Sequence, residues 1–380
     1  MASIKSLSGV AHALVLLNTL APLVAPYPSN LNVIVTASLA VFTGCIRSIK
    51  DAPPTEAMTK KDAMKFPLVG SVMLFGLFLA FKFLPKDMVN LVLTLYFILL
   101  GTFGLVATVA TLFDGLLDPK THPLRKEKCV KVPFLDEVEF SMLDVLLTPP
   151  AMLFCYWYWQ EKHWMANNVL GMAFSLQGVE HLSLGTVQNG VILLCGLFFY
   201  DVFWVFCTPV MVSVAKNFDA PIKLLFPKSL EQTEFSMLGL GDIVIPGIMV
   251  AIILRYDLAN NNGKIKYFTS CFVGYVVGIA STIVVMNVFK AAQPALLYIV
   301  PSVLLATFGH AWKEGEVDKV LYWSEEVEEE EAAGKEGNKG GNKKQNGGDD
   351  ETDDDDDDDD DASAQRAGRR SMARRRVRRD

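Results

Sequence analysis

Cysteine and histidine are scarce in this chain, and neither is grouped as it is in a metal or redox motif. The six cysteines are scattered without a Cys-x-x-Cys pair, and there are five histidines. A structural zinc site needs about four such ligands together. The sequence therefore predicts no metal site and no cofactor. Five of the cysteines lie in apolar runs and are expected to be small, membrane-buried hydrophobic residues.

Most of the chain also lacks a large excess of either positive or negative charge. From Lys313 onward there are 14 Lys and Arg against 23 Asp and Glu, a net charge of −9, whereas the residues before Lys313 carry 21 against 19, a net charge of +2. A nearly neutral body does not resemble a basic nucleic-acid surface. Nucleic acid is therefore not expected as a partner.

Apolar sequence, by contrast, is abundant. Hydrophobic residues make up 51% of the chain and fall into stretches of about 18 to 25 residues, the length that crosses a bilayer as a helix. Nine spans are predicted, at residues 31–48, 67–84, 89–113, 141–160, 165–183, 189–212, 235–254, 267–289 and 292–312. The predicted fold is an all-α membrane protein, a bundle of nine transmembrane helices within residues 29–312.

The two ends of the chain differ from this body. An apolar run at 8–26 follows Lys5, so residues 1–28 are either a cleavable signal peptide, which we favour, or an extra apolar helix. Residues 313–380 are acidic, with nine consecutive aspartates at 353–361, and then rich in arginine. This composition predicts a disordered tail. The tail either only solvates the chain, or its arginines act as a retrieval signal for the endoplasmic reticulum or bind acidic lipids.

Basic residues in the short loops predict the orientation in the membrane. If residues 27–30 face the lumen, the cytosolic loops hold 13 Lys and Arg and the lumenal loops hold seven. Cytosolic loops retain the excess of basic residues. A lumenal N-terminus and a cytosolic C-terminus are therefore expected.

Two aspartates interrupt the predicted spans at the same depth. Asp201 lies twelve residues from the cytosolic end of span 189–212, and Asp242 lies twelve residues from that of span 235–254. At 1.5 Å per residue, both lie about 18 Å inside the membrane. A charged group there costs several kcal/mol, so each aspartate is a candidate functional residue.

Two carboxylates in contact in a low dielectric cannot both be charged, so one holds a proton while the other stays ionised. An aspartyl protease uses this state to activate water and to protonate the peptide carbonyl. Gly239 and Gly241 leave room for a backbone beside Asp242, and Tyr200 can carry a hydrogen bond near Asp201. A proton- or cation-coupled transporter would show the same aspartate pair, so that alternative stays open.

A third motif opens the last span, at Gln293-Pro294-Ala295-Leu296. Pro294 lacks an N–H and suits the start of a helix, and Ala295 is small enough for close packing. Together, Tyr200-Asp201, Gly239-Leu240-Gly241-Asp242 and Pro294-Ala295-Leu296 resemble the signature of the signal peptide peptidase and presenilin family. The separations, 41 residues between the aspartates and 52 from Asp242 to Pro294, are similar to those of its signal peptide peptidase branch.

The resemblance extends over about residues 30–312 and includes the segments 162–168, 173–180 and 220–223. It implies a nine-helix bundle of the presenilin type, with Asp201 and Asp242 catalytic. By the same resemblance, the residues that support the site are Tyr200, Gly239, Leu240 and Gly241, and those that position the substrate are Gln293, Pro294, Ala295 and Leu296.

The implied activity is intramembrane aspartyl proteolysis in the endoplasmic reticulum membrane. The expected substrates are transmembrane helices in type II orientation, above all signal peptides left in the membrane after signal peptidase has cut. The implied partners are these helices and the lipid bilayer, and a homo-oligomer is left open. The main alternative is the transporter, and a second is a non-catalytic membrane protein that holds signal peptides. The separate acid and base roles of the two aspartates cannot be read from the sequence.

Overall fold

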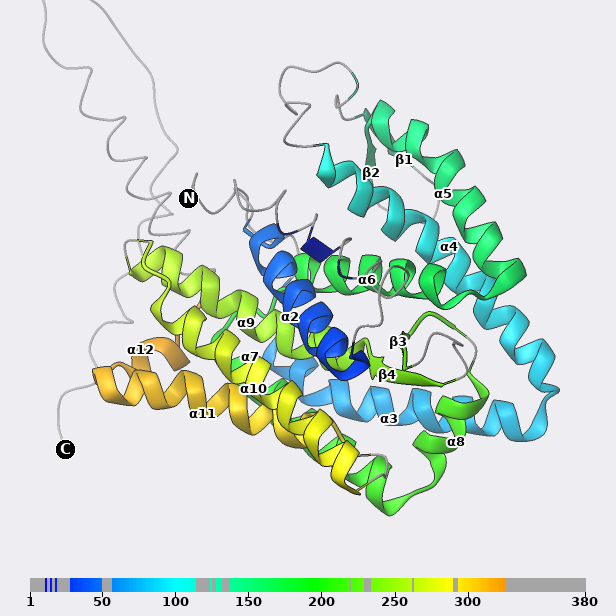
Figure 1. Cartoon of the computed structure of the whole chain (residues 1–380). Helices are drawn as coiled ribbons and strands as arrows, with labels where there is room; N and C mark the ends of the chain where they lie inside the picture. The colour runs from blue at the N-terminus through cyan, green and yellow to red at the C-terminus, as the bar shows by residue number, and fades with distance from the viewer. Residues whose placement is uncertain are drawn as a thin grey trace, which may run out of the picture. The chain divides into compact units, whose positions relative to one another are not determined.

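The computed structural model describes thirteen residues or stretches of the chain, namely 11, 14, 15, 18, 28–49, 57–113, 124, 128–131, 137–218, 220–228, 234–261, 263–289 and 293–325. All of them belong to the unit formed by residues 1–330. Long helices dominate this part of the chain (Figure 1).

Each of the nine predicted spans contains a helix. The helices are α2 (Ser29–Arg47), α3 (Lys60–Phe83), α4 (Lys86–Leu112), α5 (Met142–Glu161), α6 (Trp164–His181), α7 (Val187–Val202), α9 (Gly241–Asn260), α10 (Lys266–Phe289) and α11 (Leu296–Glu314). Among the described residues, six are long and apolar enough to cross a membrane: α2, α3, α4, α7 with the turn that follows it, α10 and α11. The chain is therefore a mostly helical, multi-span membrane protein, and the number of nine spans stays a prediction.

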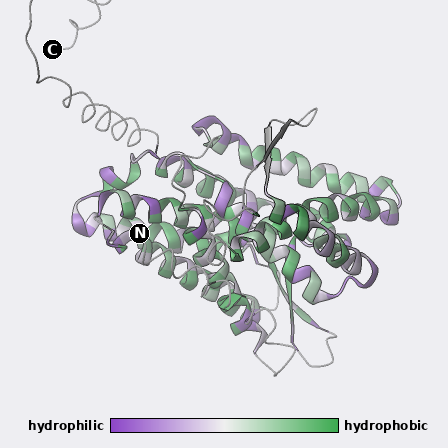
Figure 2. Ribbon diagram, turned by 90° about the horizontal axis from the view of Figure 1, so that it is seen from above, coloured by the Kyte–Doolittle hydropathy of each residue, from purple (hydrophilic) through white to green (hydrophobic). Residues whose placement is uncertain are grey.

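Helix α9 lies at the centre of this arrangement. It packs against α2, α6, α7, α10 and α11, and its residues 248–254 are all buried. A helix that is apolar on every side is typical of the interior of a bundle. Helices α3 and α4 instead expose large apolar side chains such as Met73 and Phe103, as expected of helices that face lipid. Figure 2 shows apolar residues along the helices and hydrophilic residues mainly near their ends.

Two short hairpins interrupt the helices. Strand β1 (Lys128–Lys131) pairs antiparallel with β2 (Glu137–Phe140), and β3 (Lys223–Pro227) pairs antiparallel with β4 (Phe235–Gly239). The predicted helix at 235–254 is therefore wrong at its start, because residues 235–239 form β4. Helix α9 begins only at Gly241, since glycines at 239 and 241 disfavour a helix there, and it continues to Asn260.

The predicted helix at 189–212 is also interrupted. After Val202 the chain forms one π-helical turn, Phe203–Cys207, and Thr208 is extended. Pro209 explains the break, because a residue before proline is pushed out of the helical region. A separate helix, α8 (Val210–Asn217), follows. Asp201 therefore lies close to the end of α7 rather than in the middle of a long helix.

The predicted terminal segments fall largely outside the described residues. Within 1–28, Ala11 and Val15 are buried, and the Asn18 side-chain amide donates to Asn32 Oδ1 at 3.0 Å on α2. The choice between a signal peptide and an extra helix stays a prediction. At the other end, α11 continues to Glu314 and α12 (Val317–Leu321) follows. The predicted disordered tail at 313–380 is therefore wrong at its start, because residues 313–325 belong to the folded body. The rest of that tail lies outside the described residues.

Candidate active site

Asp201 is held at the end of α7 and points to the start of α11. Its side chain is buried, with 5% exposed, and its Oδ2 atom accepts a 3.0 Å hydrogen bond from the backbone N–H of Leu296. Leu296 is the first residue of α11, and Ala295 before it offers no capping side chain. The first N–H groups of a helix have no partner within it. Asp201 therefore caps α11 from a different helix.

Asp242 is the second residue of α9 and follows β4 through a short turn. The N–H of Leu240 donates to the carbonyl of Ile222 at 2.9 Å, which ties the turn to the segment before β3. A Cβ at Gly239 would lie 3.2 Å from Asp242 Oδ2, whereas a Cβ at Gly241 would meet no atom within 4 Å. Glycine at 239 therefore leaves room for the carboxylate, and the side of Gly241 is open.

The structure brings the two aspartates together. Helices α7 and α9 pack against each other, with Asp201 near the end of the first and Asp242 at the start of the second. The carboxylates are close enough for their charged forms to repel each other. One proton shared between the two groups removes this repulsion. Two carboxyl groups in this relation, Asp201 buried and Asp242 partly exposed, can act as an acid and a base on one substrate.

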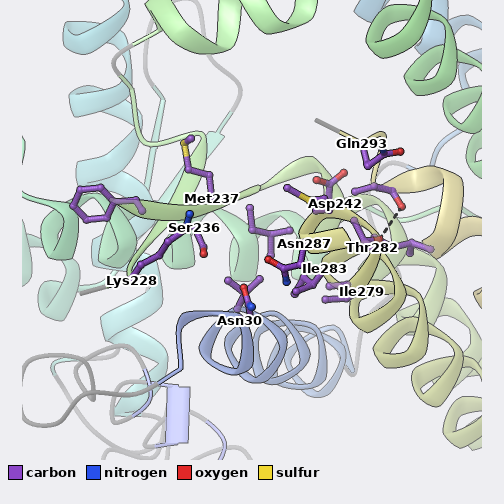
Figure 3. A pocket seen from close by; sticks show the side chains of 16 residues that line it. Asn30, Lys228, Ser236, Met237, Asp242, Ile279, Thr282, Ile283, Asn287 and Gln293 are labelled. Carbon is purple, nitrogen blue, oxygen red and sulfur yellow. Dashed lines mark hydrogen bonds between the residues drawn. The ribbon is translucent and has the colours of Figure 1, made fainter. Parts of the chain in front are cut away.

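Asp242 opens into a cavity of about 600 Å³. Its walls come from the start of α2, from strand β4, from the second half of α10 and from the start of α11 (Figure 3). The sixteen lining residues are Asn30, Val33, Lys228, Phe235, Ser236, Met237, Leu238, Asp242, Ile279, Thr282, Ile283, Met286, Asn287, Gln293, Ala295 and Ile299. A mostly apolar cavity with a few polar groups is typical of a site that binds an apolar peptide segment.

The Gln293–Leu296 segment borders both aspartates. Gln293 and Ala295 line the cavity with Asp242, and Pro294 and Leu296 are buried. The Ala295 carbonyl accepts a 3.4 Å hydrogen bond from the hydroxyl of Thr282 on α10. This segment is thus fixed between α10 and Asp201.

The Tyr200 side chain points away from the cavity that Asp242 lines. A Cβ at Gly70 on α3 would lie 3.6 Å from the Tyr200 ring, and the ring centroids of Tyr200 and Trp204 are 6.4 Å apart. Tyr200 is absent from the cavity lining. The structure therefore brings Tyr200 against α3 and not beside the cavity.

Sequence reasoning gave no role to several residues that build this site. Asn168 on α6 donates to the Leu225 carbonyl and accepts from the Leu225 N–H, both at 2.7 Å, so its amide continues β3 as a further strand would. The hydroxyl of Tyr275 on α10 donates to the backbone carbonyl of Asp242 at 3.4 Å. The one available signal was the polar pair Asn167-Asn168 at the start of an apolar run.

The chain is similar to known proteins over most of its length. Residues 50–329 match a family model described as signal peptide peptidase. The chain is 41% identical over 314 residues to the signal peptide peptidase of Homo sapiens, which covers 77% of this chain and 82% of that protein. It is equally similar to the signal peptide peptidase of Mus musculus. A probable intramembrane protease of Schizosaccharomyces pombe is 33% identical over 307 residues, 78% of this chain and 95% of that protein.

Proposed function

Because the chain belongs to the signal peptide peptidase family, a family of intramembrane proteases, we propose that it is an aspartyl protease with Asp201 and Asp242 as its catalytic pair. The observation that carries the proposal is that one segment borders both carboxyl groups: Asp201 accepts from the Leu296 N–H, and Ala295 lines the same apolar cavity as Asp242. The transporter alternative gains no support from these relatives.

In the proposed reaction, the ionised aspartate takes a proton from a water molecule as that water attacks the peptide carbonyl carbon. The protonated aspartate donates its proton to the carbonyl oxygen, which gives a tetrahedral intermediate. Collapse of this intermediate breaks the C–N bond and protonates the leaving amine. The pair exchanges these roles as a unit, so neither role is assigned to one aspartate.

The proposed substrates are transmembrane helices in type II orientation, above all signal peptides that remain after signal peptidase has cut. The proposed location is the endoplasmic reticulum membrane, with a lumenal N-terminus and a cytosolic C-terminus. A helix hides its peptide carbonyls in hydrogen bonds to the N–H groups four residues on. The substrate must therefore unwind locally, and the Gln293–Leu296 segment is suited to hold the unwound strand beside the aspartates.

A transition-state analogue tests the aspartyl mechanism. A peptide in which a secondary alcohol replaces the scissile carbonyl mimics the tetrahedral intermediate and binds more tightly than substrate. A photoreactive form of it should label the wild-type protein and be displaced by the unlabelled analogue. Asp201→Asn and Asp242→Asn should each lose labelling, and Asp87→Asn, which changes an exposed aspartate at the start of α4, should keep it. Equal labelling of all four proteins would contradict the mechanism.

A further inference from the structure

The cavity that holds Asp242 contains a second ionisable side chain, Lys228. Among the sixteen described residues that line the cavity, Lys228 and Asp242 are the only two with ionisable groups. Figure 3 shows them on opposite sides of the cavity, with Ser236 and Met237 near Lys228. A single ammonium group in a mostly apolar cavity is suited to bind an anionic group of a ligand.

The ammonium group of Lys228 is available to such a ligand. Its ion pair with Glu234 is long, at 3.6 Å, and exposed, with side-chain exposures of 49% for Lys228 and 75% for Glu234. Exposed pairs of this kind contribute little free energy. A carboxylate that enters the cavity can therefore take the place of Glu234. Asn30, Ser236 and Asn287 add neutral hydrogen-bonding groups to the same cavity.

The distance from Lys228 to the catalytic end of the cavity follows from strand β4. The Lys228 N–H donates to the Glu234 carbonyl at 2.9 Å, which fixes Lys228 beside the residue before β4. Residues 235–238 of β4 line the cavity, and Asp242 follows the strand closely. At about 3.4 Å per residue, the five steps from Glu234 to Gly239 span about 17 Å. An extended peptide of about five residues covers this length.

We propose that Lys228 binds the C-terminal α-carboxylate of the substrate, about five residues from the bond that is cut. The inference rests on the proposed function. Hydrolysis by signal peptidase leaves one new α-carboxylate on each signal peptide, at the end that lies on the lumenal side. The loop that carries Lys228 is predicted to be lumenal as well. Lys228 thus selects chains that an earlier peptide-bond hydrolysis has already shortened.

Two synthetic signal peptides test this inference. They share one sequence and differ only in a free C-terminal carboxylate or a C-terminal amide. For purified wild-type protein in detergent, we expect kcat/KM to be about five- to tenfold higher for the free acid, mainly through a lower KM. Lys228→Gln should remove this preference and Lys228→Arg should keep it. Lys86→Gln, which changes an exposed lysine at the start of α4, serves as the matched control and should keep it too.

The outcomes separate this inference from the proposed function. Equal kcat/KM for acid and amide with the wild-type protein would overturn it, and so would a full preference in Lys228→Gln. Loss of cleavage of both peptides by the wild-type protein would instead count against the protease itself. As a second measurement, Lys228→Glu should have a higher kcat/KM for a peptide that ends in a positively charged aminoethyl amide than for the free acid. The charges of the residue and of the peptide end are then both exchanged.

Discussion

The backbone N–H of Leu296 donates a 3.0 Å hydrogen bond to the carboxylate of Asp201. This bond joins the first residue of α11 to the end of α7, so the Pro294-Ala295-Leu296 motif orients one of the two proposed catalytic groups. A carboxylate at the N-terminal end of a helix also interacts favourably with the helix dipole. The third sequence motif therefore has a direct structural role in the site.

Replacement of Asp201 should separate its structural role from its chemical one. In Asp201→Asn the amide oxygen can still accept from the Leu296 N–H, whereas in Asp201→Ala this buried N–H loses its partner. We expect Asp201→Ala to be less stable than Asp201→Asn by about 1–3 kcal/mol, with neither variant active. Thermal unfolding in detergent checks this. Equal stability of the two variants would mean that the hydrogen bond does not contribute.

The packing of α10 on α11 should control the position of the same segment. A Cβ at Gly278 would lie 2.7 Å from the backbone Cα of Ile299, so Gly278→Ala must push α11 away from α10. We expect a loss of stability of about 1–3 kcal/mol and a lower kcat. Gly309→Ala on α11 is the matched control, because a Cβ there meets no atom within 4 Å. That variant should gain up to about 1 kcal/mol from helix propensity, and an unchanged kcat in Gly278→Ala would refute the prediction.

Asn168 should hold the β3–β4 hairpin against α6. In Asn168→Asp the side chain can still accept from the Leu225 N–H, but it can no longer donate to the Leu225 carbonyl. We expect the free energy of unfolding to fall by about 1–3 kcal/mol and hydrogen–deuterium exchange to be faster in strands β3 and β4. Asn260→Asp, at an exposed position near the end of α9, should leave that exchange unchanged. Slow exchange in both variants would show that Asn168 does not fix the hairpin.

The residues after α11 should belong to the folded body as far as Glu325. Trp323 is buried and packs its ring against Tyr256, with centroids 5.6 Å apart. Glu325 forms an ion pair with Arg255 and accepts a 2.9 Å hydrogen bond from the Ser183 hydroxyl. A chain that ends after Glu325 should keep the melting temperature and activity of the full chain.

A chain that ends after Gly315 loses these contacts and leaves Arg255 without its carboxylate partner. Burial of a large aromatic side chain contributes about 1.5–3 kcal/mol, and loss of the partly buried ion pair of Arg255 adds to the cost. The melting temperature of the shorter chain should therefore fall clearly. Two truncated proteins with the same melting temperature would place the boundary of the folded body earlier than we do.

The fold could be predicted from the sequence where length and apolarity decide the outcome. Long apolar runs, such as 86–112, are helices because a bilayer-length run satisfies its backbone hydrogen bonds only in that form. The prediction failed at 235–239, where a short apolar run does not distinguish a strand from a helix. The partner strand at 223–227 lies earlier in the chain, and this pairing leaves no periodic pattern in the sequence.

The candidate site could be predicted in part for a similar reason. Asp201 and Asp242 stand out because acidic residues are rare in apolar helices. The contacts that position them join distant parts of the chain, as when Asn168 binds Leu225 or Asp201 binds Leu296. In the sequence, Lys228 is only one of the seven basic residues in the predicted lumenal loops. Its place in the cavity depends on the hairpin, which the sequence did not predict.

Cleavage by single-aspartate variants tests the central claim most directly. A signal peptide in detergent is incubated with purified wild-type protein, Asp201→Asn, Asp242→Asn and the control Asp87→Asn, and the products are identified by mass spectrometry. We predict that the wild type and Asp87→Asn cut within the apolar segment of the peptide and that both other variants are inactive while remaining folded. Cleavage at the same bond by either Asp201→Asn or Asp242→Asn would contradict the account.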